Sequence, residues 1–175
     1  MKPETFYSHG KLLLTGEYVV LDGALSLAFP TKFGQSMEIS PLKEPKLIWK
    51  SFDDTNNIWF ETVFTLQEIA KSSVTLDNDK ANRLFQMLQA TQQLNPGFLK
   101  TGCQVKTQLT FPQDWGLGSS STLINNMANW AQVDPYKLLG LTFGGSGYDI
   151  ACAQHNTAIT YQIENNIRHI KEANF

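Results

Sequence analysis

The chain has 175 residues, of which 42% are hydrophobic and 17% are charged, and its formal net charge is −2. This length suits one domain with a substantial core, and the composition is typical of a soluble globular protein. The charge gives no general attraction to nucleic acid or to an anionic membrane, so any anion-binding site must be local.

Cysteine usage and the absence of long apolar runs indicate the cellular compartment in which the protein is expected. Only Cys103 and Cys152 are present, without paired Cys/His spacing, which argues against a disulfide framework and a structural zinc site. The longest aliphatic run near the start, Leu12 to Leu14, is too short for the core of a signal peptide. We therefore expect a cytoplasmic protein with two reduced thiols, and no export or membrane segment.

The first third of the chain predicts extended structure. Residues 6–20 are interpreted as strand segments broken at Gly10 and Gly16, and Asp22-Gly23 is a turn signal before a strand at 25–29. Turn formers between the last two of three further β-like runs predict a hairpin. The three runs are residues 37–39, 47–52 and 58–64. Their aromatic residues could line a ligand, although packing in the core or on a sheet face is favoured.

The rest of the chain predicts helices with one closing strand. Residues 79–94 carry apolar residues at helical intervals and stop at Asn95-Pro96-Gly97, and Asp134-Pro135 begins a short helix that ends near Leu141. A glycine-rich loop at 144–147 leads into the next helix start, and a strand follows. That strand covers residues 158–163, and the polar residues 164–175 predict no element.

The segment from Pro112 to Thr122 concentrates glycine and hydroxyl residues. The alternation over 103–111 predicts a strand before it, and the apolar spacing over 123–131 predicts a helix after it, whose start the serines would cap. Gly116 and Gly118 allow backbone angles that a Cβ would forbid, so successive N–H groups can converge on one ligand. With the positive end of the helix dipole behind it, this loop predicts a phosphate site.

A plainer interpretation of this loop stays open from the residues alone. An ordinary strand–turn–helix connection would use Gly and Ser in the same places, as turn and cap. The loop is not a Walker loop, because no Lys follows the second glycine in the required arrangement, and it lacks the third glycine of a dinucleotide-binding fingerprint. The density of donors nevertheless favours phosphate binding.

Three features that are far apart in the sequence together suit phosphoryl transfer to a hydroxyl. They are the donor-rich loop, Lys11 after Gly10, and Asp149 at the tip of the second glycine loop. Amides and a helix end serve the phosphates, a cation serves the developing charge, and a carboxylate orients or deprotonates the acceptor. For Lys11 and Glu17 taken alone, a solvated charge at a strand end is the plainer interpretation.

Three segments resemble motifs of the small-molecule kinases named for galactokinase, homoserine kinase, mevalonate kinase and phosphomevalonate kinase, the GHMP family. Pro112–Thr122 resembles the second motif, Pro-x-x-x-Gly-Leu-Gly-Ser-Ser-Ala-Ser. Gly10–Tyr18 is similar to the opening motif of the mevalonate and phosphomevalonate branch, and Ser146–Ala151 resembles the Ser-Gly-x-Asp-x-Ala segment. That last segment contains Gly-Tyr-Asp-Ile-Ala, which is similar to the signature of one subgroup. The resemblance runs from about residue 6 to residue 163.

The resemblance implies an α+β fold in which the N-terminal half is like ribosomal protein S5 domain 2 and the C-terminal half is ferredoxin-like. We expect residues 1–163 to form the N-terminal, ATP-binding domain, and residues 164–175 to be a polar tail or the start of an inter-domain connection. The third motif of the family, a glycine-rich loop of the ferredoxin-like domain, has no counterpart here, so that domain is expected to be missing. The face it would cover predicts a homo-oligomer or a partner chain.

The resemblance also implies roles for individual residues. Asp149 would be the catalytic base or orienting acid, and Lys11 would stabilise it and the transferring phosphoryl group. Ser120 would be the hydroxyl nearest Mg²⁺. The residues expected to hold ATP are Gly116, Leu117, Gly118, Ser119, Ser120 and Ser121. In mevalonate kinases a glutamate helps to hold Mg²⁺, whereas the matching region here, around Leu138, is apolar, and Asp134 and Glu17 are weak substitutes.

The leading hypothesis is therefore an ATP-dependent kinase that transfers the γ-phosphoryl group to a hydroxyl or phosphate of a small metabolite, similar to mevalonate or phosphomevalonate kinase. The alternative is a truncated, non-catalytic nucleotide-binding or interaction domain of the same ancestry. A third class, RNA binding through an S5-like fold, is disfavoured by the negative net charge and the absence of a basic stripe.

Overall fold

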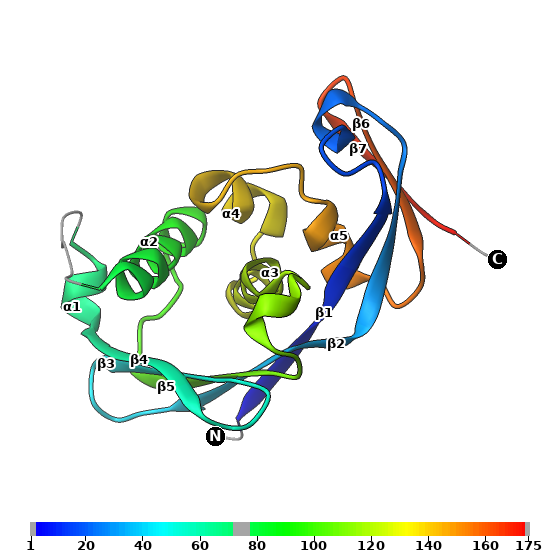
Figure 1. Cartoon of the computed structure of the whole chain (residues 1–175). Coiled ribbons are helices and arrows are strands. Elements are labelled where there is room, and N and C mark those ends of the chain that lie inside the picture. Colours follow the sequence, from blue (N-terminus) through cyan, green and yellow to red (C-terminus); the bar gives the residue numbers. More distant parts are fainter. Residues whose placement is uncertain (1–2, 72–77, 174–175) are drawn as a thin grey trace.

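A computed structural model describes residues 3–71 and 78–173. In this part of the chain, seven strands form one bent sheet, and the helices lie on its concave side (Figure 1). The strands are β1 (Glu4–Thr15), β2 (Ser26–Pro41), β3 (Lys46–Phe52), β4 (Ile58–Thr65), β5 (Cys103–Leu109), β6 (Ile159–Glu164) and β7 (Ile167–Glu172). The helices are α1 (Leu66–Ile69), α2 (Asp79–Leu94), α3 (Ser119–Ala131), α4 (Pro135–Thr142) and α5 (Tyr148–Gln154), with 3-10 turns η1 (Val20–Asp22) and η2 (Gln113–Trp115). The predicted α+β class is confirmed.

The long strand β2 joins the two halves of the sheet. One of its edges pairs antiparallel with β1 along most of the length of both strands. Its other edge pairs with β5 through residues 35–41 and with β6 through residues 26–28. The sheet order is therefore β4-β3-β5-β2-β6-β7, with β1 beside β2 (Figure 1). This arrangement places β1 against the helices α3 and α5, which carry the predicted site.

The predicted break at Gly10 and the predicted division of the second strand are wrong, whereas β1 does end at Thr15, just before the predicted break at Gly16. Gly10 lies inside β1, at a register irregularity between His9 and Lys11, and does not end the strand. Residues 26–41 are one strand through Gly34, where the sequence predicts two short runs. Both glycines allow close backbone approach, since a Cβ at Gly34 would lie 2.2 Å from the Ser8 carbonyl oxygen. Residues after Gly16 turn into η1 and are not extended.

The hairpin and helix predictions in the middle of the chain are confirmed. β3 and β4 pair antiparallel, and the turn between them is held by Asp53, which accepts hydrogen bonds from the backbone N–H groups of Thr55 and Asn57. Helix α2 covers residues 79–94, as its periodicity predicts, and Asp134 caps α4. Helix α1 was not predicted, because it has a single turn. Among the described residues, no helix combines the length and apolar character needed to cross a membrane.

Two hydrophobic cores hold these layers together. The larger one lies between the sheet and helices α2, α3 and α4, and Leu47, Val105 and Ile124 are fully buried in it. The smaller one joins α5 to β2 and β6 through Ala28, Cys152 and Ile159. Trp49, Phe60 and Phe64 are buried in the larger core, as expected, and Trp59 packs against that core while partly exposed. Phe52 is partly exposed and belongs to neither core. Helices α3 and α5 thus meet β1 where the two cores adjoin.

The strand β7 was missed, because the sequence predicts no element after residue 163. Residues 167–172 pair with β6 in an antiparallel hairpin, and Asn165 and Asn166 form its turn with positive φ angles of 51° and 62°. Such an Asn-Asn pair is a recognisable hairpin signal. The strand itself is mostly exposed, so it shows little hydrophobic alternation. Residues 174–175 of the predicted tail lie outside the described residues.

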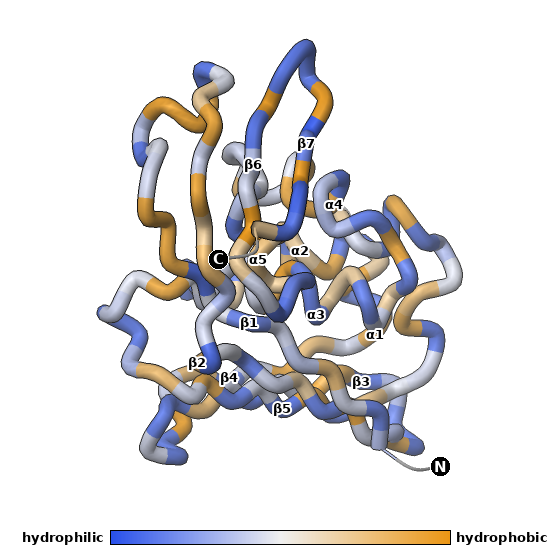
Figure 2. The backbone as a smooth tube through the Cα atoms, turned by 90° about the vertical axis from the view of Figure 1, so that its right-hand side faces the viewer, coloured by the Kyte–Doolittle hydropathy of each residue, from blue (hydrophilic) through white to orange (hydrophobic). Residues whose placement is uncertain are grey.

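An exposed apolar end distinguishes the β1–β2 connection. Leu14, Leu21 and Leu25 are each exposed over 60–64% of their surface, and Tyr18 over 90%. Figure 2 shows hydrophobic stretches along this connection, beside the β6–β7 hairpin. Leu13 lies between two exposed leucines and packs against the smaller core, so alternate residues of β1 face opposite sides of the sheet.

Candidate functional site

The glycine loop between β5 and α3 is docked on β1. The backbone N–H of Lys11 donates to the carbonyl oxygen of Leu117 at 2.9 Å. Gly116 and Gly118 both have positive φ, at 67° and 82°, as the predicted tight loop requires. A Cβ at Gly118 would lie 3.2 Å from Cγ of Lys11, so a larger residue would press on the lysine side chain. The loop and the lysine are therefore one structural unit.

The first turn of α3 has no side-chain cap. Its N-cap residue is Gly118, and no side chain accepts a hydrogen bond from the helix N-terminus. The prediction that the serines cap this helix is wrong, because they lie inside its first turn and a cap must precede that turn. The first N–H groups of a helix have no intrahelical partner, so together with the positive end of the helix dipole they are able to bind an anion.

A buried polar network anchors α3 to the sheet just below this turn. The Asn126 side chain accepts from the Ser8 hydroxyl at 2.7 Å and donates to the Gln35 carbonyl at 2.9 Å. The Thr122 hydroxyl lies 3.1 Å from Oε1 of Gln35, and the Asn125 amide donates to Ser8 at 2.9 Å. Buried hydrogen bonds of this kind are costly to break. They fix the helix start relative to β1 and β2.

Lys11 and Asp149 come together at the start of α3. The lysine Nζ lies 3.9 Å from Oδ1 of Asp149, and the side chains are exposed over 19% and 30% of their surface. Ser121 donates its hydroxyl to Oδ2 of Asp149 at 3.3 Å. Oδ1 is buried and has no hydrogen-bond partner among the described residues. One carboxylate oxygen thus accepts a hydrogen bond from Ser121, while the other lies near the lysine charge.

Tyr148 and Cys152 surround this ion pair with apolar material. Nζ of Lys11 lies 5.4 Å from the centre of the Tyr148 ring, within the range of a cation–π contact. Burial raises the pKa of Tyr148, and the charge of Asp149 raises it further. Burial and the same carboxylate raise the pKa of the Cys152 thiol to about 12. Both groups are therefore neutral at physiological pH.

A cavity of about 210 Å³ lies between the start of α3 and the glycine loop at 144–147. Asp149 and the hydroxyl residues Ser120 and Ser121 border it, opposite the loop at 144–147. In that loop Gly144, Gly145 and Gly147 all have positive φ. The complete lining is Ser120, Ser121, Ile124, Leu139, Phe143, Gly144, Gly145, Ser146, Gly147 and Asp149. Two of the three predicted features, Asp149 and the serines of the donor-rich loop, therefore border one space, and Lys11 joins them through its ion pair with Asp149.

An aromatic pocket of about 290 Å³ adjoins this cavity, and sequence reasoning missed it. Ser120 and Phe143 border both spaces. The Trp59 ring faces the ammonium of Lys80 at 4.7 Å, and its buried Nε1–H has no partner among the described residues. The lining is Gln35, Trp49, Ser51, Trp59, Phe60, Asp79, Lys80, Arg83, Leu84, Met87, Ser119, Ser120, Leu123 and Phe143. The aromatic residues at the end of the β3–β4 hairpin were the sequence feature that could have indicated this pocket.

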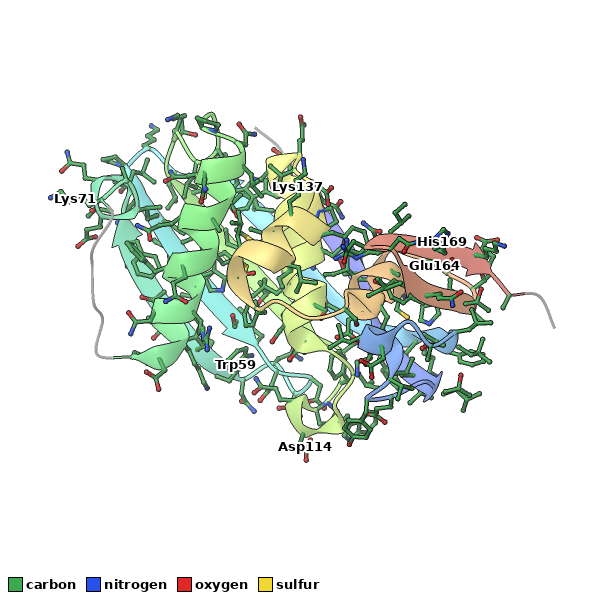
Figure 3. The ribbon with its side chains drawn as sticks, turned by 90° about the horizontal axis from the view of Figure 1, so that it is seen from above. Trp59, Lys71, Asp114, Lys137, Glu164 and His169 are labelled. Carbon is green, nitrogen blue, oxygen red and sulfur yellow. The ribbon has the colours of Figure 1, made fainter. Side chains whose placement is uncertain are left out.

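The described residues do not form a metal site of their own. No group of three or more His, Cys, Asp or Glu side chains that could hold an ion occurs in the described part. Leu138 is fully buried in the larger core, and Asp134 is used as the cap of α4. Figure 3 shows Lys137 of that first turn on the opposite side of the molecule from Asp114 of the glycine loop. Asp134 is therefore not a substitute ligand.

Glu17 stays closer to the site. It is exposed, and its charge is among the causes that raise the pKa of Tyr148. The Ser120 hydroxyl is exposed at the head of α3. Mg²⁺ usually takes one or two carboxylates besides phosphate oxygens and water. Here the Ser120 hydroxyl and the Asp149 carboxylate are available, but Asp149 is already paired with Lys11. These two groups do not suffice to hold Mg²⁺ without a bound phosphate.

Solved kinase structures share this architecture. The mevalonate kinase of Methanococcus jannaschii matches with a TM-score of 0.72 at 16% identity, over 99% of this chain and 56% of that one. The galactokinase of Lactococcus lactis, complexed with galactose, matches with 0.64 at 17%, over 98% and 47%. A D-glycero-D-manno-heptose 1-phosphate kinase from Bacteroides thetaiotaomicron matches with 0.71 at 14%, over 97% and 59%. The chain has the fold of these GHMP-family kinases.

The similarity extends over only part of those structures. The chain spans about half the length of the solved structures it matches, 47–59% of each. No protein-family model matches the sequence, and no curated protein matches it. At 14–18% identity these structures show the fold, and they do not assign a substrate or a role to any residue. The function must be argued from the site itself.

Proposed function

We propose that this chain binds ATP and transfers its γ-phosphoryl group to a hydroxyl or phosphate of a small metabolite, in the manner of mevalonate and phosphomevalonate kinases. One observation carries the proposal. Asp149, which forms an ion pair with Lys11, borders the same cavity as Ser120 and Ser121 at an uncapped helix N-terminus that follows a glycine loop. The kinase fold of the solved structures supports it. Membership of the GHMP family, including the Gly-Tyr-Asp-Ile-Ala subgroup, is part of the proposal.

The glycine loop suits the phosphates of ATP. The residues proposed to hold them are Gly116, Leu117, Gly118, Ser119, Ser120 and Ser121. The cradle is built for close approach, because a Cβ at Gly118 would press on Lys11 and a Cβ at Gly116 would point into open space. Phosphate oxygens would accept from the free amides of the first turn of α3. The ammonium of Lys11 adds a positive charge at the same place.

The aromatic pocket suits the base of the nucleotide. It begins at Ser119 and Ser120, where the phosphates would lie, and extends to Trp59. A base is flat and largely apolar, so it can stack on an indole ring. The unpartnered Nε1–H of Trp59 is a free donor at this position. The two adjoining cavities therefore support the proposal that one nucleotide occupies both, with its phosphates at α3 and its base at Trp59.

Asp149 and Lys11 would carry out the chemistry. Asp149 would accept the proton of the acceptor hydroxyl as the new oxygen–phosphorus bond forms and the bond to the β-phosphate oxygen breaks. Lys11 would stabilise the carboxylate and the negative charge on the transferring phosphoryl group. Ser121 would keep the carboxylate oriented through its hydrogen bond to Oδ2. For an acceptor phosphate, Asp149 would orient the acceptor and take no proton.

Mg²⁺ would reach the site with the nucleotide. When bound, it neutralises phosphate charge, and the Ser120 hydroxyl is the proposed ligand from this chain. The described residues supply no carboxylate cluster for the ion. We therefore expect measurable Mg²⁺ binding only when nucleotide is present, and titration calorimetry with and without ADP tests this.

Turnover across a substrate panel tests the kinase proposal. ADP release is measured by a coupled enzyme assay with Mg·ATP and a set of small alcohols and phosphorylated acids. We expect one acceptor class to stimulate ADP release above the rate with water alone. Nucleotide binding without any turnover would favour the alternative, a non-catalytic nucleotide-binding domain. Failure to bind ATP at millimolar concentration would contradict both.

The exposed apolar end of the β1–β2 connection suits a protein partner. Leu14, Tyr18 and Leu25 are large apolar residues, each exposed over 60% or more. Contiguous exposed apolar surface favours association. We propose that a second copy of the chain or a partner chain covers this end. Neither nucleic acid nor a membrane is a proposed partner, and a cytoplasmic location is part of the proposal.

A further inference from the structure

The carbonyl group of Ser146 is held by two donors from the β6–β7 hairpin. The hydroxyl of Tyr161 on β6 donates to this oxygen in a short hydrogen bond. Nε of Arg168 on β7 donates to the same oxygen at 3.2 Å. Ser146 itself is 8% exposed and is the one non-glycine residue at 144–147. Two side chains from outside the loop thus hold Ser146, the residue of the loop with the least backbone freedom.

The surroundings keep the arginine in this position. The guanidinium carbon of Arg168 lies 4.6 Å from the centre of the Tyr136 ring, so the side chain is stacked as well as hydrogen-bonded. A Cβ on Gly147 would lie 2.9 Å from the Tyr136 ring and 3.3 Å from Nε of Arg168. The loop, α4 and β7 are therefore packed together without room for a side chain at residue 147.

This contact lies directly before the residue proposed to be catalytic. Gly147 is the N-cap of α5, and its carbonyl accepts from the N–H of Ala151 at 3.1 Å. Asp149 is the second residue of that short helix. Burial of Ile150, Ala151 and Cys152 holds the body of α5 in the core. Because the three glycines of the loop have positive φ and little intrinsic stiffness, the hydrogen bonds to Ser146 add a restraint at the start of that helix.

We infer that Arg168 is a positioning residue, which acts with Tyr161 through the Ser146 carbonyl to hold Asp149 against Lys11. This inference rests on the proposed function for its effect on turnover, but the restraint itself does not. The contacts of Arg168 are with Ser146, Tyr136 and Tyr161, so its effect on Asp149 would be indirect. The β6–β7 hairpin, which sequence analysis missed, thus becomes part of the site.

Amide hydrogen exchange in the full chain tests the restraint without requiring catalysis. The variants are Arg168→Gln, which removes the cation and the stacked guanidinium, and Tyr161→Phe, which keeps the buried ring. Lys171→Gln is the matched control, because it removes one cation from the same exposed strand. We expect exchange at residues 144–149 to rise about threefold to tenfold in both variants, while residues 116–121 and the control are unchanged. If amide exchange at residues 144–149 is as slow in Arg168→Gln as in the wild type, the inference is overturned.

Kinetics test the positioning role. With an acceptor found in the substrate panel, we expect kcat to fall about tenfold in Arg168→Gln with KM for ATP unchanged, and Arg168→Lys to recover part of the loss. In the double variant, which combines Arg168→Gln with Tyr161→Phe, the loss of kcat expressed as a free energy should be smaller than the sum of the two single losses. The reason is that both donors act on one oxygen. Faster exchange at 144–149 with an unchanged kcat would overturn the role of Arg168 in positioning. Wild-type protein without turnover would reject the proposed function, and the exchange measurement would still decide whether the restraint exists.

Discussion

Nζ of Lys11 on β1 lies 3.9 Å from Oδ1 of Asp149 at the start of α5, although the two residues are near opposite ends of the chain. The pair forms because β1 contacts both α3 and α5, and because β2 ties β1 to β6. Ser121 of α3 completes the contact through the second carboxylate oxygen. A local chemical unit is thus built from three distant segments.

Replacement of Asp149 tests its role as base. Asp149→Asn keeps the size of the side chain but cannot accept a proton from a hydroxyl acceptor, so we expect kcat to fall about 10²–10⁴-fold. Because the backbone amides proposed to hold the phosphates are unchanged, the dissociation constant for ATP should change little. Steady-state kinetics and titration calorimetry measure the two quantities. Retained turnover in Asp149→Asn would rule this residue out as the base.

A methyl group at residue 118 tests the phosphate cradle. Gly118→Ala places a Cβ 3.2 Å from Lys11 in a backbone conformation with φ of 82°, which costs about 1–2 kcal/mol for a non-glycine residue. We expect the dissociation constant for ATP to rise about tenfold or more, measured by calorimetry. Gly140→Ala is the control, since it lies within α4 with open space around it and should leave binding unchanged. Equal ATP affinity in both variants would contradict the proposed role of the glycine loop in binding ATP.

Removal of the indole at residue 59 tests the base pocket. We expect Trp59→Ala to weaken ATP binding about tenfold, because a stacked base loses roughly 1–3 kcal/mol on such a change. Binding of inorganic triphosphate should not change, since it contacts only the loop. Ile58→Ala removes a neighbouring residue of β4 that is 45% exposed, and it should bind ATP normally. A parallel loss of triphosphate binding in Trp59→Ala would contradict the assignment of the pocket to the base.

The buried thiol of Cys152 makes stability depend on pH in the alkaline range. Its pKa is raised from 9.0 to about 12 in the folded protein. Below about pH 9 the thiol is protonated in both the folded and unfolded states, so its contribution does not vary. Between about pH 9 and 12 the unfolded state loses the proton first, and the free energy of unfolding should fall by up to about 1.4 kcal/mol per pH unit.

Urea unfolding at several pH values measures this effect. Cys103 has a pKa raised to about 12 by burial as well, so the two thiols contribute together. The variant Cys152→Ala should have a shallower decline between pH 9 and 12 than the wild type. An identical decline in both proteins would show that Cys152 ionises equally in the folded and unfolded states.

A charge on the exposed apolar end tests association. Leu14 on β1 is 60% exposed, and Val63 on β4 is 58% exposed, so Leu14→Asp and Val63→Asp make a matched pair. We expect the wild type and Val63→Asp to form oligomers at tens of micromolar, and Leu14→Asp to be monomeric, because a carboxylate is costly to bury. Light scattering gives the masses. A monomeric wild type, without added partner, would count against self-association through this end.

The sequence by itself determined most of the local structure and the residue types of the site. Helical spacing placed α2, α3 and α4 closely, because an amphipathic helix must bury one face. Glycines at 116 and 118 signalled the loop, because few other residues adopt its backbone angles. The strand β7 and the continuity of β2 through Gly34 escaped prediction, because edge exposure and close backbone contacts depend on neighbours that are distant in sequence.

Only the tertiary structure decided how those residues are combined. Lys11 and Asp149 could each have been a solvated charge, and their pairing depends on β1 lying against two helices. The aromatic pocket at Trp59 and the hydrogen bond from Arg168 to Ser146 also bring together segments that are distant in sequence, and local sequence patterns do not predict such contacts. The physical reason is that local sequence sets the conformation and apolar face of each element, whereas contacts between elements arise when those faces pack in one core.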